Sequence, residues 1–392
     1  MAGAVALVIF GLIPPAAAAA GIVKGLDVYL FLTGMMLLAE VARRESLFDW
    51  LATLATSASK GSPIRLFTLI YGVGILVTAF LSNDATAVVL TPAVFAATAA
   101  AKVKDPVPYV LICAFVANAA SFVLPISNPA NLVVFGGGHM PPLGGWIEQF
   151  LAPSLAAVAI TYVALYMTQW RSLSEGRIEQ NVAVTRLSPG GWIAAVGIGA
   201  TAALLMSVSA LDIALGAPTA AFGLLTAVGA LLSRRAAPWG LIKEISWSVL
   251  PLVAGLFVLV EALSRTNAVV ELADVVKWAS DASPPGSAWV AGVAVALVSN
   301  LVNNLPAGLL AGSALHSAHA SSGIVSATLI GVDLGPNLSV TGSLATILWL
   351  TALRRENVRV SAWQFFKLGA LVMTPALMGA LAANLWLPNA QR

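Results

Sequence analysis

Four short polar clusters interrupt segments of the sequence that are otherwise apolar. Two lie in the first half of the chain, around residues 82–84 and 127–131, and two in the second half, around 303–304 and 333–346. Neutral amides and hydroxyls can coordinate a cation or hydrogen-bond a small polar solute without burying a net charge. We therefore predict one substrate-binding site formed by Ser82, Asn83, Asp84, Ser127, Asn128, Asn131, Asn303, Asn304, Thr341, Gly342, Ser343 and Thr346.

Two carboxylates belong to these clusters. An ionisable side chain at membrane depth costs about 2.5–3.5 kcal/mol on insertion scales, so its presence is a functional hypothesis. Burial favours the protonated form of a carboxyl group, which would let Asp84 carry a proton. Asp333 opens the last cluster and is predicted either to titrate as a second coupling group or to cap a helix.

The composition identifies the kind of element that must position these clusters. The chain has 392 residues, of which 59% are apolar and 9% are charged, and its mean hydropathy is +0.90. Residues 106–147 and 282–332 contain no Asp, Glu, Lys or Arg. About 20 apolar residues cross a bilayer, so each tract is long enough for two passes. The fold class predicted is an all-α polytopic membrane protein, with residues 2–22 as an uncleaved first span.

The chain also repeats itself. A shift of 221 residues places segment 31–55 on segment 252–276, and the identities include Glu40 with Glu261 and Arg44 with Arg265. Both Glu–Arg pairs have the spacing that favours a helical ion pair, and we expect them to anchor span ends. The four polar clusters match pairwise under the same shift, although Asn side chains also join helices structurally in many bundles.

Charge placement predicts that the two repeats are inverted. With a re-entrant hairpin over residues 66–101, one topology puts 16 of the 20 Lys and Arg residues in cytoplasmic loops, as the positive-inside rule favours. This topology has the N-terminus inside, the C-terminus outside, and about nine spans plus two hairpins. The domains predicted are a first repeat over 1–170, a linker and connecting helix over 171–211, and a second repeat over 212–392. Interrupted helices within inverted repeats are typical of secondary transporters.

Enzyme and nucleic-acid functions find no support in the sequence. It contains no GxxxxGK[ST] phosphate loop, no HExxH and no GxSxG. Its single cysteine, Cys113, and the isolated His316 and His319 do not make a metal site, and we expect no cofactor. The small net charge of +3 is explained by cytoplasmic loops, so no nucleic-acid partner is predicted.

At the polar clusters the sequence resembles the bacterial arsenite efflux permease family, within the ion transporter superfamily that also holds citrate and dicarboxylate carriers. The segments that carry the resemblance are LSNDATAVVLTP (81–92), ANAASFVLPISNPANLVV (117–134), NLVNNLPAGLL (300–310) and DLGPNLSVTGSLATILWL (333–350).

This resemblance implies an elevator-type carrier in the cell inner membrane that exports arsenite and antimonite hydroxides in exchange for protons. The resemblance also implies association with a soluble arsenical ATPase, and it is compatible with an oligomeric transporter. The clusters contain no Lys or Arg, which fits a neutral hydroxide better than a citrate-like anion. The alternative prediction is a sodium- or proton-coupled citrate or dicarboxylate carrier of the same architecture. A passive channel or an intramembrane enzyme is less consistent with polar groups confined to the helix breaks.

Overall fold

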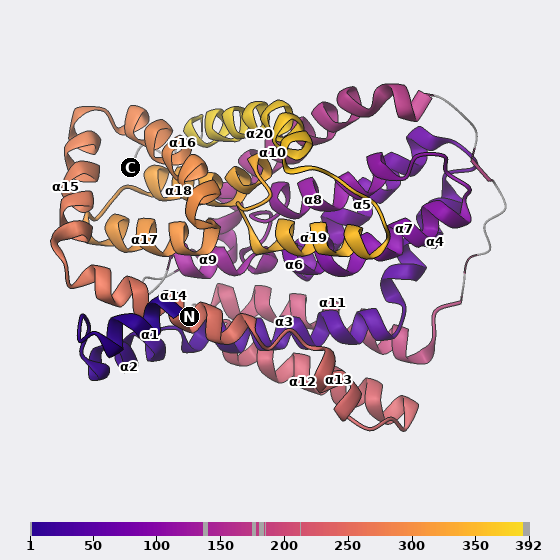
Figure 1. The fold of residues 1–392 in the computed structure, drawn as a ribbon, viewed down its shortest axis with the longest axis horizontal. Helices are drawn as coiled ribbons and strands as arrows, with labels where there is room; N and C mark the ends of the chain where they lie inside the picture. Colours follow the sequence, from indigo (N-terminus) through magenta and orange to yellow (C-terminus); the bar gives the residue numbers. More distant parts are fainter. Residues whose placement is uncertain are drawn as a thin grey trace.

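A computed structural model describes residues 2–135, 140–174, 178–179, 184, 186–211 and 213–386. All the regular secondary structure in these ranges is helical (Figure 1). The elements are α1 (Ala2–Ile9), α2 (Pro15–Lys24), α3 (Leu26–Arg44), α4 (Leu47–Ala58), α5 (Pro63–Phe80), α6 (Asn83–Ala85), η1 (Thr86–Leu90), α7 (Thr91–Ala100), α8 (Val107–Ala119), η2 (Pro125–Ser127), α9 (Pro129–Val134), α10 (Leu143–Ser174), α11 (Pro189–Ala210), α12 (Gly216–Arg234), α13 (Trp239–Glu244), α14 (Val249–Ser264), α15 (Asn267–Ala282), α16 (Pro284–Val302), α17 (Asn304–Ser317), α18 (Ser322–Leu334), η3 (Gly335–Leu338), α19 (Leu344–Arg355) and α20 (Ala362–Leu385).

Several helices are long and apolar enough to cross a membrane. Six helices of the described residues meet this criterion alone, namely α5, α10, α11, α12, α16 and α20. Two further pairs, α2 with α3 and α14 with α15, meet it as bent units. These helices confirm the expected multi-pass architecture.

The first apolar segment differs from the single span predicted over residues 2–22. Helix α1 ends at Ile9, and α2 begins only at Pro15. Gly11 between them has a φ of +69°, a left-handed conformation that glycine adopts without steric cost. Pro14 then precedes another proline, and a residue before proline avoids the helical region. The sequence therefore breaks this segment in spite of its apolar length.

The helix breaks fall at the four polar clusters. In the first half, α5 ends just before Ser82, and α8 is separated from α9 by an irregular segment. In the second half, α16 ends at Val302, just before Asn303, and α18 is separated from α19 in the same way. The predicted hairpin over 66–101 corresponds to α5, α6, η1 and α7, with its tip at 82–84. In the linker predicted over 171–190, residues 175–177, 180–183 and 185 lie outside the described residues.

Each hairpin packs against a broken helix from the other half of the chain. Helices α16 and α17 form the second hairpin, with its tip at 303–304. Helix α17 lies along α9, and α19 lies along α6 and η1 of the first hairpin. The contact of α17 with α9 is close enough that a Cβ atom on Gly312 would overlap the carbonyl oxygen of Val134. The two halves of the chain therefore contact each other where their helices are broken by polar clusters.

A second layer runs beneath these elements and contains α3, α11 and α12 (Figure 1). Helices α3 and α12 meet through two glycines, since a Cβ atom on Gly34 would overlap the carbonyl oxygen of Thr219, and one on Gly223 would lie 2.5 Å from the carbonyl oxygen of Gly34. Small residues allow this close approach, which drives helix association in a membrane.

We expect Gly34→Leu to destabilise the protein by about 1–3 kcal/mol, because the new side chain must push α12 away from α3. The measurement is thermal unfolding of the purified protein in detergent. Gly72→Leu is the matched control, since a Cβ atom on Gly72 of α5 would meet nothing within 4 Å. Equal unfolding temperatures for the two variants would contradict the close contact.

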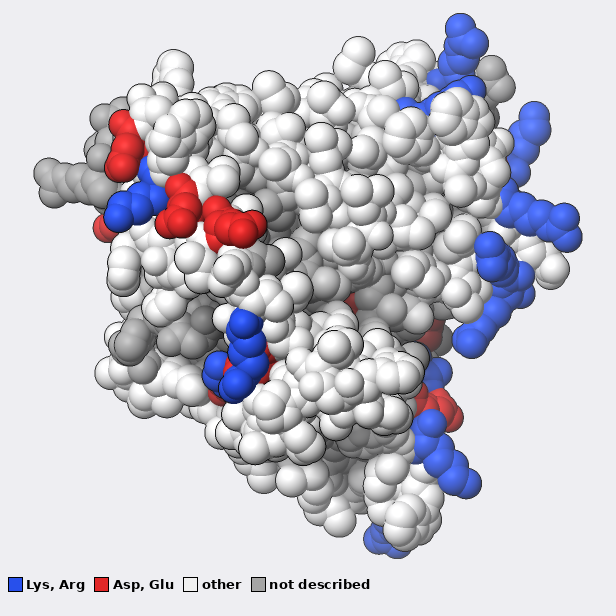
Figure 2. All heavy atoms as spheres, turned by 60° about the vertical axis from the view of Figure 1, so that its left-hand side comes forward, with Lys and Arg blue, Asp and Glu red and all other residues white. Residues whose placement is uncertain are grey.

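Charged side chains concentrate at the two ends of the molecule. Figure 2 shows Lys and Arg gathered at one end, on the right, and most visible Asp and Glu at the opposite end. Both predicted helical pairs are present, with Nε of Arg44 3.0 Å from Glu40 and Nη2 of Arg265 3.1 Å from Glu261. Lys24 adds a second partner for Glu261 at 2.7 Å. These pairs fasten the ends of α3 and α14.

Candidate functional site

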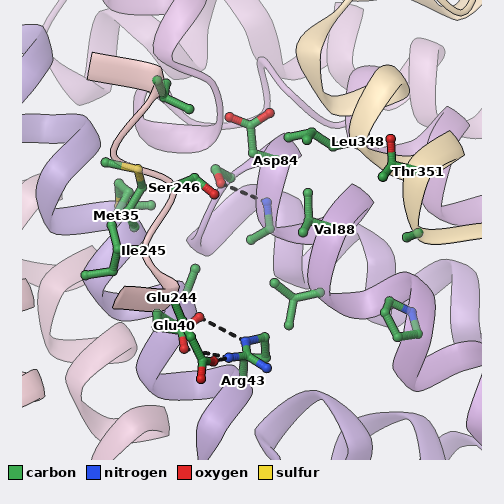
Figure 3. Close-up of a pocket in the computed structure, with 18 of the residues that line it drawn as sticks. Met35, Glu40, Arg43, Asp84, Val88, Glu244, Ile245, Ser246, Leu348 and Thr351 are labelled. Atoms are coloured by element: carbon green, nitrogen blue, oxygen red, sulfur yellow. Dashed lines mark hydrogen bonds and ion pairs between the residues drawn. The ribbon is translucent and has the colours of Figure 1, made fainter. Parts of the chain in front are cut away.

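A cavity of about 590 Å³ lies where α3 faces the first hairpin and α19 (Figure 3). Its walls come from α3, from the segment that joins α13 to α14, from α6 and η1, and from α19. Figure 3 labels Met35, Glu40, Arg43, Asp84, Val88, Glu244, Ile245, Ser246, Leu348 and Thr351 around it. The cavity therefore reaches the polar tip of the first hairpin from one side.

Asp84 presents a carboxylate to this cavity. It is the second residue of the short helix α6 and is only partly buried, whereas its neighbours Asn83 and Ala85 are buried. The described residues give its carboxylate no hydrogen bond and no ion pair, although its backbone N–H donates to Asn83 Oδ1 at 2.9 Å. An unpaired carboxylate at the end of a cavity is available to a proton, a cation or a hydroxyl-bearing solute.

One of the two guanidiniums that line the cavity, that of Arg43, is occupied by carboxylates. Arg43 donates to Glu40 at 2.7 and 2.9 Å and also pairs with Glu244. Arg44, just outside the lining, pairs with the same two carboxylates. With Asp84 and Glu356, four carboxylates line the cavity against two guanidiniums, those of Arg43 and Arg355. The cavity is consequently a poor environment for a polyanion.

The first hairpin tip is held by its own side chains. Ser82 caps α6, since its Oγ accepts a hydrogen bond from the N–H of Ala85 at 3.1 Å. Thr78 and Thr86 bridge the two arms of the hairpin through a buried hydroxyl contact of 2.8 Å. The backbone continues as a π-helical turn at 86–90, a distortion found frequently at functional sites.

The break between α8 and α9 in the first half is also held by hydrogen bonds. Asn128 Oδ1 accepts from the N–H of Ala130 and so caps α9, while Ser127 donates to the carbonyl of Ala79 at 3.1 Å, which ties the break to the hairpin. Asn131 donates to three backbone carbonyls, those of Ser121, Leu124 and Pro125. Ser127, Asn128 and Asn131 are buried and do not line the cavity.

The second half has corresponding contacts. The N–H of Asn304 donates to the carbonyl of Gly342 at 2.9 Å, so this hairpin tip is also tied to its broken helix. Ser343 caps α19 and contacts Thr346 at 2.9 Å, and Thr341 donates to the carbonyl of Asn300.

Asn303 at this second tip has an unusual backbone conformation, with φ +76° and ψ 153°. This region is essentially restricted to glycine, and strained residues of this kind concentrate at functional sites. Its side chain caps α17 only through a long contact of 3.4 Å to the N–H of Leu305.

The structure thus divides the predicted site residues into two groups. Ser82 and Asp84 line the cavity, whereas the other ten hold the helix breaks together behind or beside it. Asp333 lies within the last turn of α18, so it does not cap the start of a helix; it is fully buried and accepts a 2.8 Å hydrogen bond from Nδ2 of Asn128.

Sequence reasoning missed the opposite wall of the cavity. Met35 and Met36 on α3, and Ile245, Ser246 and Val249 after α13, contribute to it. These residues sit in ordinary apolar segments and carry no local signal. It also passed over Asn118, whose Nδ2 donates to Asn337 Oδ1 at 2.9 Å across the two halves. The separation of this pair, 219 residues, is close to the repeat shift and could have revealed it.

Comparison with known proteins identifies the family. A family model described as CitMHS, citrate transporter, matches residues 1–334. The chain belongs to the CitMHS family. This CitMHS member is 29% identical over 357 residues to the arsenical pump membrane protein of Escherichia coli strain K12, covering 86% of this chain and 80% of that protein. It is 27% identical to the protein of the same name from Yersinia enterocolitica, with the same coverage. The predicted resemblance to arsenite permeases is thereby confirmed.

The more distant matches are also with proteins named as transporters. This CitMHS member is 24% identical to an uncharacterized transporter of Mycobacterium tuberculosis over 92% of the chain and 86% of the relative. Among solved structures, the Alcanivorax borkumensis YdaH transporter, whose crystal structure has an unusual topology, matches with a TM-score of 0.60 at 12% identity. The match covers 94% of this chain and 87% of that one. The CitMHS member thus has a transporter fold built from broken helices.

Proposed function

We propose that this transporter exports trivalent metalloid hydroxides, arsenite and antimonite, in exchange for protons. The observation that carries the proposal is the cavity of the first hairpin, where Asp84 offers an unpaired carboxylate and acidic side chains outnumber basic ones. Arsenite is a neutral trihydroxide at physiological pH, and its hydroxyl groups can donate to a carboxylate and to hydroxyls. Ser82, Ser246 and Thr351 supply such hydroxyls around the same cavity.

The family name makes a citrate or dicarboxylate carrier the second candidate. One feature favours it, namely the two guanidiniums of Arg43 and Arg355 in the cavity lining. However, Arg43 already pairs with Glu40 and Glu244. A citrate-like anion would also have to approach Asp84, and like charges disfavour this approach. The charge of the cavity therefore supports a neutral solute.

In this proposal Asp84 is the proton carrier. One proton that moves through 100 mV supplies about 2.3 kcal/mol, enough to concentrate a neutral solute roughly 50-fold. Asp333 lies outside the cavity and is not assigned to the transported proton. The remaining cluster residues would meet the solute when the hairpin tips shift relative to α3, in an elevator-like movement of the two interlocked repeats, 1–170 and 212–392.

We also infer that the transporter resides in the inner membrane with its basic end in the cytoplasm, as the positive-inside rule requires. Helix α3 then crosses with Arg43 and Arg44 inside. Helices α1 and α2 lie toward the opposite end in Figure 1, which favours an outer position for the start of the chain rather than the cytoplasmic one expected from sequence. The end of α20 lies toward that same outer end.

The proposal is tested with everted membrane vesicles, in which export appears as uptake. We expect arsenite and antimonite to accumulate when the vesicle interior is made acidic, and a protonophore to abolish the accumulation. Citrate and dicarboxylates, with or without sodium, should show no gradient-driven uptake. Vesicles without the protein are the control. Citrate accumulation without arsenite accumulation would establish the second candidate instead.

A further inference from the structure

Six polar side chains form a fully enclosed cluster where α8 and α18 end, apart from the cavity of the first hairpin. Each has at most 2% of its surface exposed, and the cluster joins both halves of the chain. Its members are Asn118, Ser121, Asn128, Asn131, Asp333 and Asn337.

Every amide and hydroxyl group of this cluster donates at least one hydrogen bond. The amide of Asn128 donates to Asp333 Oδ1, and that of Asn118 donates to Asn337 Oδ1. The Asn337 amide donates to the carbonyl of Phe115 at 3.0 Å. The Ser121 hydroxyl donates to the carbonyl of Asn118 at 2.7 Å. The Asn131 amide is engaged with the backbone carbonyls already described.

Three acceptor oxygens of the cluster nevertheless have no partner. They are Asp333 Oδ2, Asn118 Oδ1 and Asn131 Oδ1, and all three are buried. Ser121 lies next to all three residues that carry them: its hydroxyl donates to the backbone carbonyl of Asn118, its own backbone carbonyl accepts from the Asn131 amide, and its side chain faces the Asp333 carboxylate. Buried acceptors without partners are costly, and a cation held among these neighbouring residues would supply the missing partner.

The backbone around the cluster adds to the negative charge. Helix α8 ends at Ala119, two residues before Ser121, and Asp333 lies in the last turn of α18. The C-terminal end of a helix carries a partial negative charge. The segments 107–134 and 322–344 contain no Lys, Arg or His that could balance it.

We propose that this cluster binds a sodium ion, with Asp333 as the charged ligand and Asn118, Asn131 and Ser121 as neutral ligands. Carboxylate, amide and hydroxyl oxygens suit hard cations rather than soft ones. A single carboxylate balances a single charge, whereas a divalent ion would leave a net charge buried in the membrane. Irregular backbone and half-helix ends hold cations in the same manner in other transporters. The site does not depend on the identity of the transported solute.

The direct test is binding of radioactive sodium to the purified transporter in detergent, at fixed ionic strength with choline as the replacement cation. We expect one saturable sodium ion per chain, and an unfolding temperature that rises by about 3 °C or more as sodium is added. Asp333→Asn should lose both effects. Because its amide can donate to the orphaned oxygens, this variant should still fold and unfold without sodium at a temperature no lower than that of the wild type.

Two further variants distinguish sodium binding at this cluster from binding at the cavity of the first hairpin. Asp84→Asn also removes a carboxylate, but from the cavity of the first hairpin. This variant should retain sodium binding and the rise of the unfolding temperature with sodium. The result does not depend on whether arsenite is the transported solute. Ser121→Ala, which removes one neutral ligand, should weaken sodium binding at least 10-fold. Wild-type protein that binds no sodium, and whose unfolding responds to pH only when Asp333 is present, would overturn the proposal in favour of a proton on Asp333.

Discussion

Asp84→Asn is expected to abolish accumulation of arsenite in energised vesicles. The isosteric amide cannot exchange a proton, so the roughly 50-fold gradient sustained by one proton at 100 mV should fall to about one. Solute exchange at equal concentrations on both sides should persist, because Ser82, Ser246 and Thr351 still offer hydroxyls to the solute. Since the Asp84 carboxylate has no partner among the described residues, the substitution should leave the unfolding temperature unchanged.

The controls for this variant are available in the same chain. Asp105→Asn makes the same chemical change in the connection before α8, where Asp105 Oδ1 accepts a hydrogen bond from Val107 and asparagine can do so as well. It should transport like the wild type. Asp84→Glu keeps a titratable group and should retain part of the accumulation. Full accumulation by Asp84→Asn would remove Asp84 from the coupling mechanism.

Val88→Trp should stop transport of every solute, including equilibrium exchange, by at least about 10-fold. Val88 lies on η1 and lines the cavity, so an indole ring at this position occupies the space that the solute needs (Figure 3). The cavity can accept the added volume, so the overpacking penalty of about 1–3 kcal/mol seen in filled cores should not arise. Thermal unfolding checks the fold, and exchange of labelled arsenite measures the block.

The matched control is Leu76→Trp. Leu76 lies on α5 with 55% of its surface exposed. The Leu76→Trp variant should transport normally, because an aromatic ring is tolerated against lipid. If Val88→Trp also transports normally, the solute passes elsewhere, and the assignment of the cavity is wrong.

The sequence predicted the breaks of the fold well. Polar residues in apolar segments, Ser82, Asn83 and Asp84 in the first half and Asn303 and Asn304 in the second, marked the tips of the hairpins, and helices end at both. The repeat shift paired Glu40–Arg44 with Glu261–Arg265, and both pairs form. These features depend on local backbone chemistry and on scarce charges, both of which are visible in a sequence.

The cavity itself could not be predicted in this way. Met35 faces the first hairpin because α12 covers another face of α3, and that choice depends on a contact at Gly34 between segments almost 190 residues apart. An apolar helix in a membrane has no polar face to indicate which side meets protein. The amphipathic pattern that positions helices in soluble proteins is therefore missing here.

The first apolar segment illustrates the opposite error. Length and hydropathy suggested one span over 2–22, yet Gly11 and the pair of prolines that follows divide it. Here the glycine and the prolines were visible in the sequence, but the prediction followed apolar length and hydropathy instead.

The reciprocal contact of the hairpins with broken helices has a consequence for biogenesis. Helix α9 leaves the ribosome well before its partner α17, and at typical synthesis rates the delay between Val134 and Gly312 is about 10–30 s. During that interval a short helix with a polar break has no native neighbour in the second half. The nascent chain must be shielded by the insertion machinery or by lipid until α17 has been synthesised, so this contact between the two halves forms only late in translation.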